Sequence, residues 1–136
     1  MTLLVPNNGE GDALQYFVNR AAPENLILRL WKTPDISPSE TDTAATYTEA
    51  NWTGYAAKTL TGATWGAPTE GAPTSIAYAL QSFISTAGAQ SQTNYGYYMT
   101  RATSGRIALA ERFSDGPYTI VNLNDEIKVT PIIEAA

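Results

Sequence analysis

The stretch YGYYMTRATSGRIALAERF, Tyr95–Phe113, has the pattern of a β-hairpin. Its two halves are rich in aromatic and aliphatic residues, which suit a pleated and half-buried surface. Ser104 and Gly105 stand between the halves, and a glycine-containing turn between two such runs is a hairpin signal. We therefore predict two antiparallel strands here, with the rest of the chain packed on them.

Two further strands are predicted after this hairpin. Short apolar runs at Tyr118–Val121 and Ile127–Ile133 are separated from it and from each other by turn sequences at 115–117 and 122–125. This order predicts an antiparallel meander in which every connection from Tyr95 onward is a hairpin.

The composition narrows the possible function classes. A chain of 136 residues predicts one domain, residues 1–136. It has no histidine and no cysteine, which excludes Ser-His and Cys-His triads, disulfides and thiolate metal sites on this chain. We expect no enzyme activity, no catalytic residue, no metal site and no cofactor.

The charge and hydropathy patterns bear on the partners. The net charge is −5 with eight scattered basic residues, whereas nucleic-acid binding needs clustered Lys and Arg. No window approaches 18 consecutive apolar residues, and the first ten residues lack a basic region followed by a long apolar core. We expect no nucleic-acid partner, no membrane span and no secretory signal.

One amphipathic helix is predicted over Glu10–Ala22, before Pro23. Asn7 and Glu10 are spaced like a capping box. Four apolar residues fall on one helical face, which we expect to cover the sheet: Leu14, Phe17, Val18 and Ala21.

The central part of the chain predicts more strands. Leu26–Lys32 is apolar on both faces, so it is either a central strand or a strand whose second face meets a partner. Tyr47–Leu60 is interpreted as one strand with a bulge or as two short strands, and 63–65 as a short strand. The apolar residues of Ser75–Ser85 fit both the period of a helix and the period of two that is typical of a strand. The strands predicted on either side favour a strand.

Two segments are candidate contacts with a partner. Residues 1–8 form either an edge strand with a frayed terminus or an extended arm that packs on a neighbouring subunit. Thr33–Ala45 is a long acidic loop, either a solvated excursion or a contact loop; its acid spacing does not match an EF-hand. The expected partner-contact residues are Leu3, Leu4, Val5, Pro6, Trp31, Asp35, Ile36, Glu40 and Asp42.

Aromatic and acidic side chains offer other candidates. Six aromatics belong to a β core, to a protein interface or to a sugar-stacking platform: Trp31, Trp52, Trp65, Tyr95, Tyr97 and Tyr98. Glu111 and Asp115 are four residues apart, but a general acid/base pair needs a shared cleft, which spacing does not establish.

Four stretches together carry a family resemblance. They are LLVPN at Leu3–Asn7, APENLILRLW at Ala22–Trp31, SPSETDTAATYTEANWTGYAAKTLTGATW at Ser37–Trp65, and YGYYMTRATSGRIALAERFSDGPYTIVNLNDEIKVTP at Tyr95–Pro131. In overall pattern they resemble a family of small virion proteins of tailed bacteriophages. The resemblance implies a β-rich virion component, a capsid decoration (cement) protein first and a tail or fibre component next, and it assigns no site residues.

Together these observations set the expectations. The fold class expected is mainly β, an antiparallel β-sandwich or jelly-roll-like barrel of about eight strands with one short N-terminal α-helix. The resemblance implies a homotrimer made in the bacterial host cytoplasm, which binds the major capsid protein on the capsid surface of the virion and stabilises the shell. The alternatives are a tail or fibre component, or a carbohydrate- or receptor-binding module.

Overall fold

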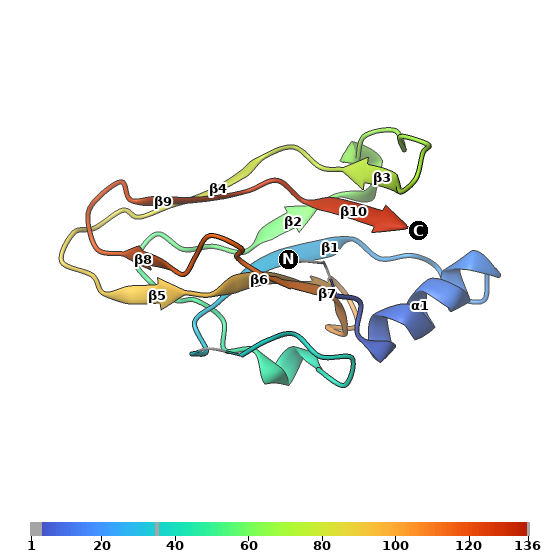
Figure 1. Cartoon of the computed structure of the whole chain (residues 1–136), viewed down its shortest axis with the longest axis horizontal. Helices are drawn as coiled ribbons and strands as arrows, with labels where there is room; N and C mark the ends of the chain where they lie inside the picture. Colours follow the sequence, from blue (N-terminus) through green and yellow to red (C-terminus); the bar gives the residue numbers. More distant parts are fainter. Residues whose placement is uncertain (1–3, 35, 136) are drawn as a thin grey trace.

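The computed structural model describes residues 4–34 and 36–135 (Figure 1). The expected fold class is confirmed: the described chain is mainly β, with one N-terminal α-helix, α1 (Asn7–Phe17), and ten antiparallel strands in several sheets. These sheets do not close, so no jelly-roll-like barrel is formed. The strands are β1 (Leu26–Trp31), β2 (Lys58–Leu60), β3 (Thr74–Ala77), β4 (Gln81–Ile84), β5 (Gln92–Asn94), β6 (Gly96–Arg101), β7 (Ile107–Arg112), β8 (Tyr118–Ile120), β9 (Glu126–Val129) and β10 (Ile132–Ala135).

The predicted hairpin is confirmed. Strands β6 and β7 pair antiparallel from Gly96 opposite Arg112 to Thr100 opposite Ile107, with a bulge near the turn. The turn contains Gly105, whose φ of +71° lies in the left-handed region that glycine tolerates best. The turn residue and the strand pattern, both local features of the sequence, therefore indicate the same hairpin.

The predicted meander is wrong, because the later strands do not pair with their neighbours in sequence. Instead β8 pairs with β5, β9 with β4 and β10 with β3, all antiparallel. These pairs are nested around the β6–β7 hairpin. Residues 74–135 therefore form one long two-stranded ribbon whose tip is the turn at Gly105.

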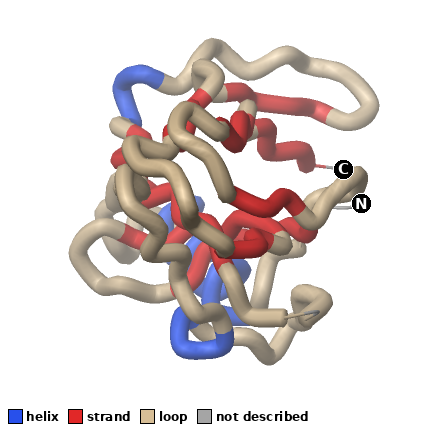
Figure 2. Tube along the Cα trace, turned by 90° about the vertical axis from the view of Figure 1, so that its left-hand side faces the viewer, coloured by secondary structure: helices blue, strands red, loops and turns tan. Residues whose placement is uncertain are grey.

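This ribbon bends back on itself and makes two layers. The bend consists of residues 85–91 and 121–125, at the left end of Figure 1. Beyond it, β4 and β9 lie over the four-stranded sheet of order β2-β1-β6-β7. The strands occupy the centre of the view along the long axis, and long loops run around them (Figure 2). Between the layers lies the main core, which includes Leu28, Leu30, Leu60, Phe83, Met99, Leu109, Ile127 and Val129.

The second face of the four-stranded sheet is covered by the chain itself. Trp31 on β1 and Tyr98 on β6 pack with Tyr47 from the loop that follows β1; the Tyr47 and Tyr98 rings stack at 4.9 Å. Every residue of β6 is buried as a result. Strand β1 pairs with β2 on one side and β6 on the other, which confirms that it is a central strand.

Some local predictions differ from the structure. Tyr47–Leu60 contributes only β2 and an isolated bridge from Glu49 to Trp31, because Gly54 turns the chain with a φ of +100°. Residues 63–65 are largely a 3-10 turn rather than a strand. Ser75–Ser85 is extended as predicted, but as two strands, β3 and β4.

Helix α1 begins and ends earlier than predicted. Pro6 is the N-cap and no side chain caps the helix, so the predicted capping box of Asn7 and Glu10 is absent. At the other end Asn19 adopts a φ of +58°, and the Arg20 N–H donates to the Gln15 carbonyl at 2.8 Å. This is the Schellman arrangement, which asparagine tolerates, and it stops the helix before Pro23.

Helix α1 packs on the sheet through the face opposite to the predicted one. Its buried residues are Gly9 and Asp12, whereas Leu14, Phe17 and Val18 are exposed. A Cβ added to Gly9 would lie 2.2 Å from the Ala108 carbonyl oxygen, so only glycine permits this approach to β7. The prediction that the apolar face covers the sheet is therefore wrong.

Asp12 explains this orientation. Its carboxylate accepts hydrogen bonds from the Arg101 Nε at 2.8 Å and from the Arg106 Nε at 3.2 Å. Arg101 is itself buried, and its guanidinium lies 4.6 Å from the centre of the Tyr16 ring. A buried guanidinium needs an anionic partner, and Asp12 supplies it only when this helix face is turned inward.

Replacing Asp12 by alanine tests this account. Removing one member of a buried ion pair leaves the other charge unpaired, so we expect Asp12→Ala to lower the free energy of unfolding by about 3 kcal/mol. Urea denaturation of the purified protein measures this change.

The matched control is Glu10→Ala, which removes an exposed acid from the first turn of the same helix. Loss of the interaction between Glu10 and the helix dipole is expected to lower the free energy of unfolding by less than about 1 kcal/mol. Equal effects of the two substitutions would contradict the role given to Asp12.

Candidate functional site

Helix α1 presents an apolar surface to solvent. Leu14, Phe17 and Val18 are 68%, 88% and 67% exposed, and their spacing places them on one side of the helix. Single exposed apolar residues are ordinary, but several on one helix face are typical of an interaction site. We call these three residues the α1 face.

A shallow groove lies beside the helix. It has a volume of about 240 Å³, and its walls are almost entirely apolar. Tyr16 from α1 contributes to it, so the groove lies beside the C-terminal end of the helix, one residue from Phe17 in the sequence. The other apolar residues that line this α1 groove are Pro23, Leu26, Leu60, Trp65, Ile76 and Ile133.

A second apolar set lies at the ribbon bend. Ile84 ends β4, and Val121 and Leu123 lie in the turn between β8 and β9; all three are exposed. We call them the bend cluster. The bend and α1 are at opposite ends of the long axis of the molecule (Figure 1). The described chain therefore carries separate apolar surfaces at its two ends.

The N-terminal contact residues are built into the fold of their own chain. Leu4 exchanges two backbone hydrogen bonds with Ala110, both 2.9 Å, so it extends the sheet beyond β7. Val5 packs on the main core and Pro6 is buried. Asn7 and Asn8 belong to α1, so the predicted arm boundary at residue 8 is wrong. Leu3 lies outside the described residues.

The acidic loop is also tied down. Asp42 accepts hydrogen bonds from the Ser39 N–H at 2.8 Å and from the Tyr47 hydroxyl at 2.7 Å. The carbonyl of Glu40 accepts the Asn7 N–H at 2.9 Å, which joins the loop to the start of α1. Ile36 is half-buried against the Trp31 cluster, and the Glu40 side chain is exposed. Asp35 lies outside the described residues.

Trp31, a predicted partner contact, is buried within its own chain. Its side chain has 0% exposure because Tyr47 and Tyr98 pack against it on the second face of the sheet. Trp52, Tyr97 and Tyr98 are core residues too, which confirms the core interpretation for most of the aromatics. Trp65 and Tyr95 are half-buried.

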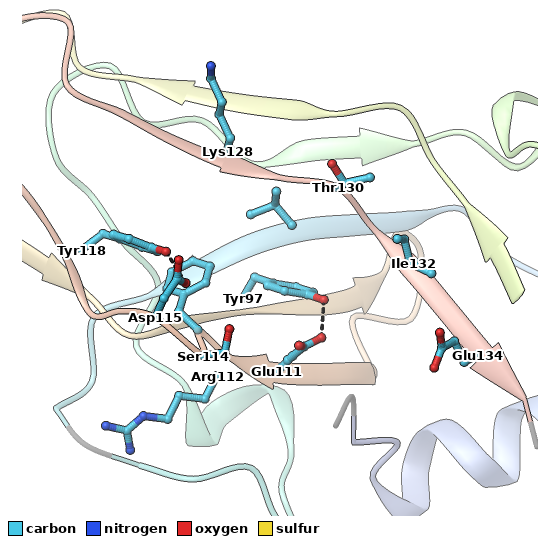
Figure 3. Close-up of a pocket in the computed structure, with 12 residues that line it drawn as sticks. Tyr97, Glu111, Arg112, Ser114, Asp115, Tyr118, Lys128, Thr130, Ile132 and Glu134 are labelled. Atoms are coloured by element: carbon cyan, nitrogen blue, oxygen red, sulfur yellow. Dashed lines mark hydrogen bonds between the residues drawn. The ribbon is translucent and has the colours of Figure 1, made fainter. Parts of the chain in front are cut away.

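An open cleft of about 600 Å³ lies between the end of β7 and strands β9 and β10 (Figure 3). Glu111 and Asp115 both line it, so the two acids share a cleft. Each, however, is turned toward a tyrosine: the Tyr97 hydroxyl donates to Glu111 at 2.6 Å, and the Tyr118 hydroxyl donates to Asp115. Burial first, and then the bond to Glu111, raises the pKa of Tyr97.

The cleft combines aromatic ring faces with polar oxygens. Phe113 and Tyr118 place their rings 4.9 Å apart at its edge, beside carboxylate and hydroxyl oxygens. Within residues 4–34 and 36–135, no three acids gather in a way that would hold a metal ion. In the same part of the chain, no helix has the length and apolar character needed to cross a membrane.

Sequence reasoning identified the α1 face but assigned it to the core. The missed signal was Asp12, an acidic residue on the opposite face of the helix. Its partners are the two arginines of the predicted hairpin. The bend cluster was missed because its residues come from two segments far apart in the sequence, the end of β4 and the turn between β8 and β9, and share no periodicity. No protein-family model, curated protein or solved structure matches this chain.

The buried tyrosines predict a loss of stability at high pH. Burial, and then the charge of Glu49, raises the pKa of Tyr98 to about 12, whereas an unfolded tyrosine ionises near pH 10. Above pH 10 the folded chain therefore binds more protons than the unfolded chain. We expect the free energy of unfolding, measured in urea, to fall between about pH 10 and about pH 12.

Tyr98→Phe is the matched variant, because it removes one titrating hydroxyl and keeps the ring. Its free energy of unfolding should fall less over this pH range than that of the unmodified chain. An equal fall in the two proteins would contradict the contribution of Tyr98.

Proposed function

We propose that this chain is a structural protein of a bacteriophage virion that decorates the capsid shell. The observation that carries the proposal is the pair of exposed apolar surfaces at opposite ends of the molecule, the α1 face and the bend cluster. A protein that bridges neighbours needs two separate contacts. The likeness to small phage virion proteins over most of the chain supports the same role.

The proposed mechanism is mechanical. The bend cluster contacts the major capsid protein, and the α1 end makes a second contact, with a neighbouring protein on the same shell. Each contact is small, because a set of three apolar side chains removes only a few hundred Å² from water. A symmetric shell repeats the contact many times and holds each bridge at two points, so weak contacts combine into strong attachment.

The packed interior suits this role. The long ribbon folds over the four-stranded sheet, so the two ends are connected through one continuous core. A rigid connection transmits a load between the two contacts without unfolding.

The exposed Glu40 side chain beside the start of α1 stays a predicted polar contact.

The copy number in purified particles tests the proposal. We expect a ratio to the major capsid protein near one-to-one or a simple fraction of it, measured by quantitative mass spectrometry. A few copies per particle would assign the chain to the tail or a fibre instead. Absence from the particle would overturn the virion role.

Substitution at the bend tests the shell contact. We expect the double variant Val121→Ser, Leu123→Ser to bind assembled shells at least about tenfold more weakly, because buried apolar side chains at an interface carry much of its binding energy. Cosedimentation of the variant with shells measures binding. Leu80→Ser is the control, since Leu80 is exposed but lies away from the bend; equal binding by all three proteins would refute the bend contact.

A second candidate function is glycan binding by a virion receptor-binding module. The observation that favours it is the open cleft, where the rings of Phe113 and Tyr118 adjoin carboxylates and hydroxyls. Sugars stack their C–H faces on aromatic rings and donate hydroxyl hydrogen bonds to carboxylates. A glycan array probed with the chain and with Phe113→Ala should then show binding by the first protein only. Absence of any glycan signal would leave the cleft without this role.

A further inference from the structure

The α1 face and the α1 groove are an exposed apolar protrusion and an apolar recess at the same end of helix α1. Phe17 is 88% exposed and projects from the helix as an apolar knob. The α1 groove, about 240 Å³, is lined by apolar residues such as Leu26, Trp65 and Ile133. Phe17 leaves the groove of its own chain empty, because its side chain is turned to solvent.

We propose that a second copy of this chain occupies the α1 groove, with Phe17 of each copy inserted into the groove of the other. In a pair related by a twofold axis, the knob of each copy meets the groove of the other, so one symmetric arrangement makes both insertions. The contact is therefore isologous and closes after two copies. This assignment concerns the α1 end alone and requires no shell.

Charge at the rim favours a second copy as the occupant. Arg20 follows the knob, is exposed, and pairs with no acid among the described residues. Glu24 stands at the rim of the groove and accepts hydrogen bonds from the Thr103 and Ser104 N–H groups, both 2.7 Å. These backbone hydrogen bonds lower the pKa of Glu24, so it is anionic at neutral pH. An entering Phe17 therefore brings a cation toward a fixed anion.

The area of the contact sets the expected affinity. An inserted aromatic side chain buries about 150–250 Å², and two reciprocal insertions with Leu14 and Val18 beside them approach the low end of specific interfaces, about 1,200 Å² in total. We therefore expect reversible association with a micromolar Kd rather than an obligate dimer.

The groove can be blocked without disturbing the fold. Gly62 lines it, and a Cβ at this position meets only the Asn25 side-chain oxygen, at 3.6 Å. That distance is ordinary van der Waals contact. Gly62→Leu is therefore expected to fill the groove from its own side, whereas Phe17→Ser removes the knob.

Sedimentation equilibrium of the full chain over a range of concentrations tests the proposal. We expect self-association of the unmodified protein and a rise in Kd of about 30-fold or more in Phe17→Ser and in Gly62→Leu, as for an interface hot spot. Leu80→Ser, a comparable loss of an exposed apolar side chain outside α1 and the groove lining, should leave the Kd unchanged. Thermal unfolding of each variant checks that the fold is retained.

Mixing the two variants gives a sharper result. Gly62→Leu keeps the knob and Phe17→Ser keeps the groove, so their mixture retains one of the two insertions. The mixture should associate more strongly than either variant alone. A monomeric unmodified protein, an unchanged Kd in Phe17→Ser, or no gain on mixing would each overturn the proposal. None of these results bears on shell binding, which uses the bend cluster.

Discussion

The contact between Asp12 and the two arginines of the hairpin, Arg101 and Arg106, governs how the N-terminal third of the chain meets the sheet. Burying Arg101 without an anion would cost several kcal/mol. The ion pair therefore fixes the rotation of α1 about its own axis. Its consequence is that Leu14 and Phe17 face solvent, where they form an interaction surface.

The nested ribbon has a comparable effect on the rest of the molecule. Because β3, β4 and β5 pair with β10, β9 and β8, the two halves of the ribbon are in register from the turn at Gly105 outward. Bending this ribbon once produces both layers of the sandwich and buries the main core between them. The same bend places Val121 and Leu123 at the end of the molecule farthest from α1.

The two apolar ends together suit the molecule to bridge two partners, whereas one end alone would contact a single partner. One end carries a knob beside a groove of matching character, which favours association between identical copies. The other end carries a small apolar cluster on a tight bend, which suits contact with a different protein. A chain without histidine or cysteine needs no reactive group for such a role, because bridging depends on shape, burial and the number of contacts.

Local patterns in the sequence determined the fold class and the β6–β7 hairpin, and they gave a central position for β1 as one of two alternatives. These depend on strand periodicity and on one glycine turn, which act over a few residues. The partners of β8, β9 and β10, the burial of Trp31 and the orientation of α1 were decided only by the tertiary structure. Strand pairing across 60 residues and a buried ion pair between Asp12 and Arg101 join distant segments. These contacts contribute to stability only when the distant segments meet, so no local sequence pattern predicts them.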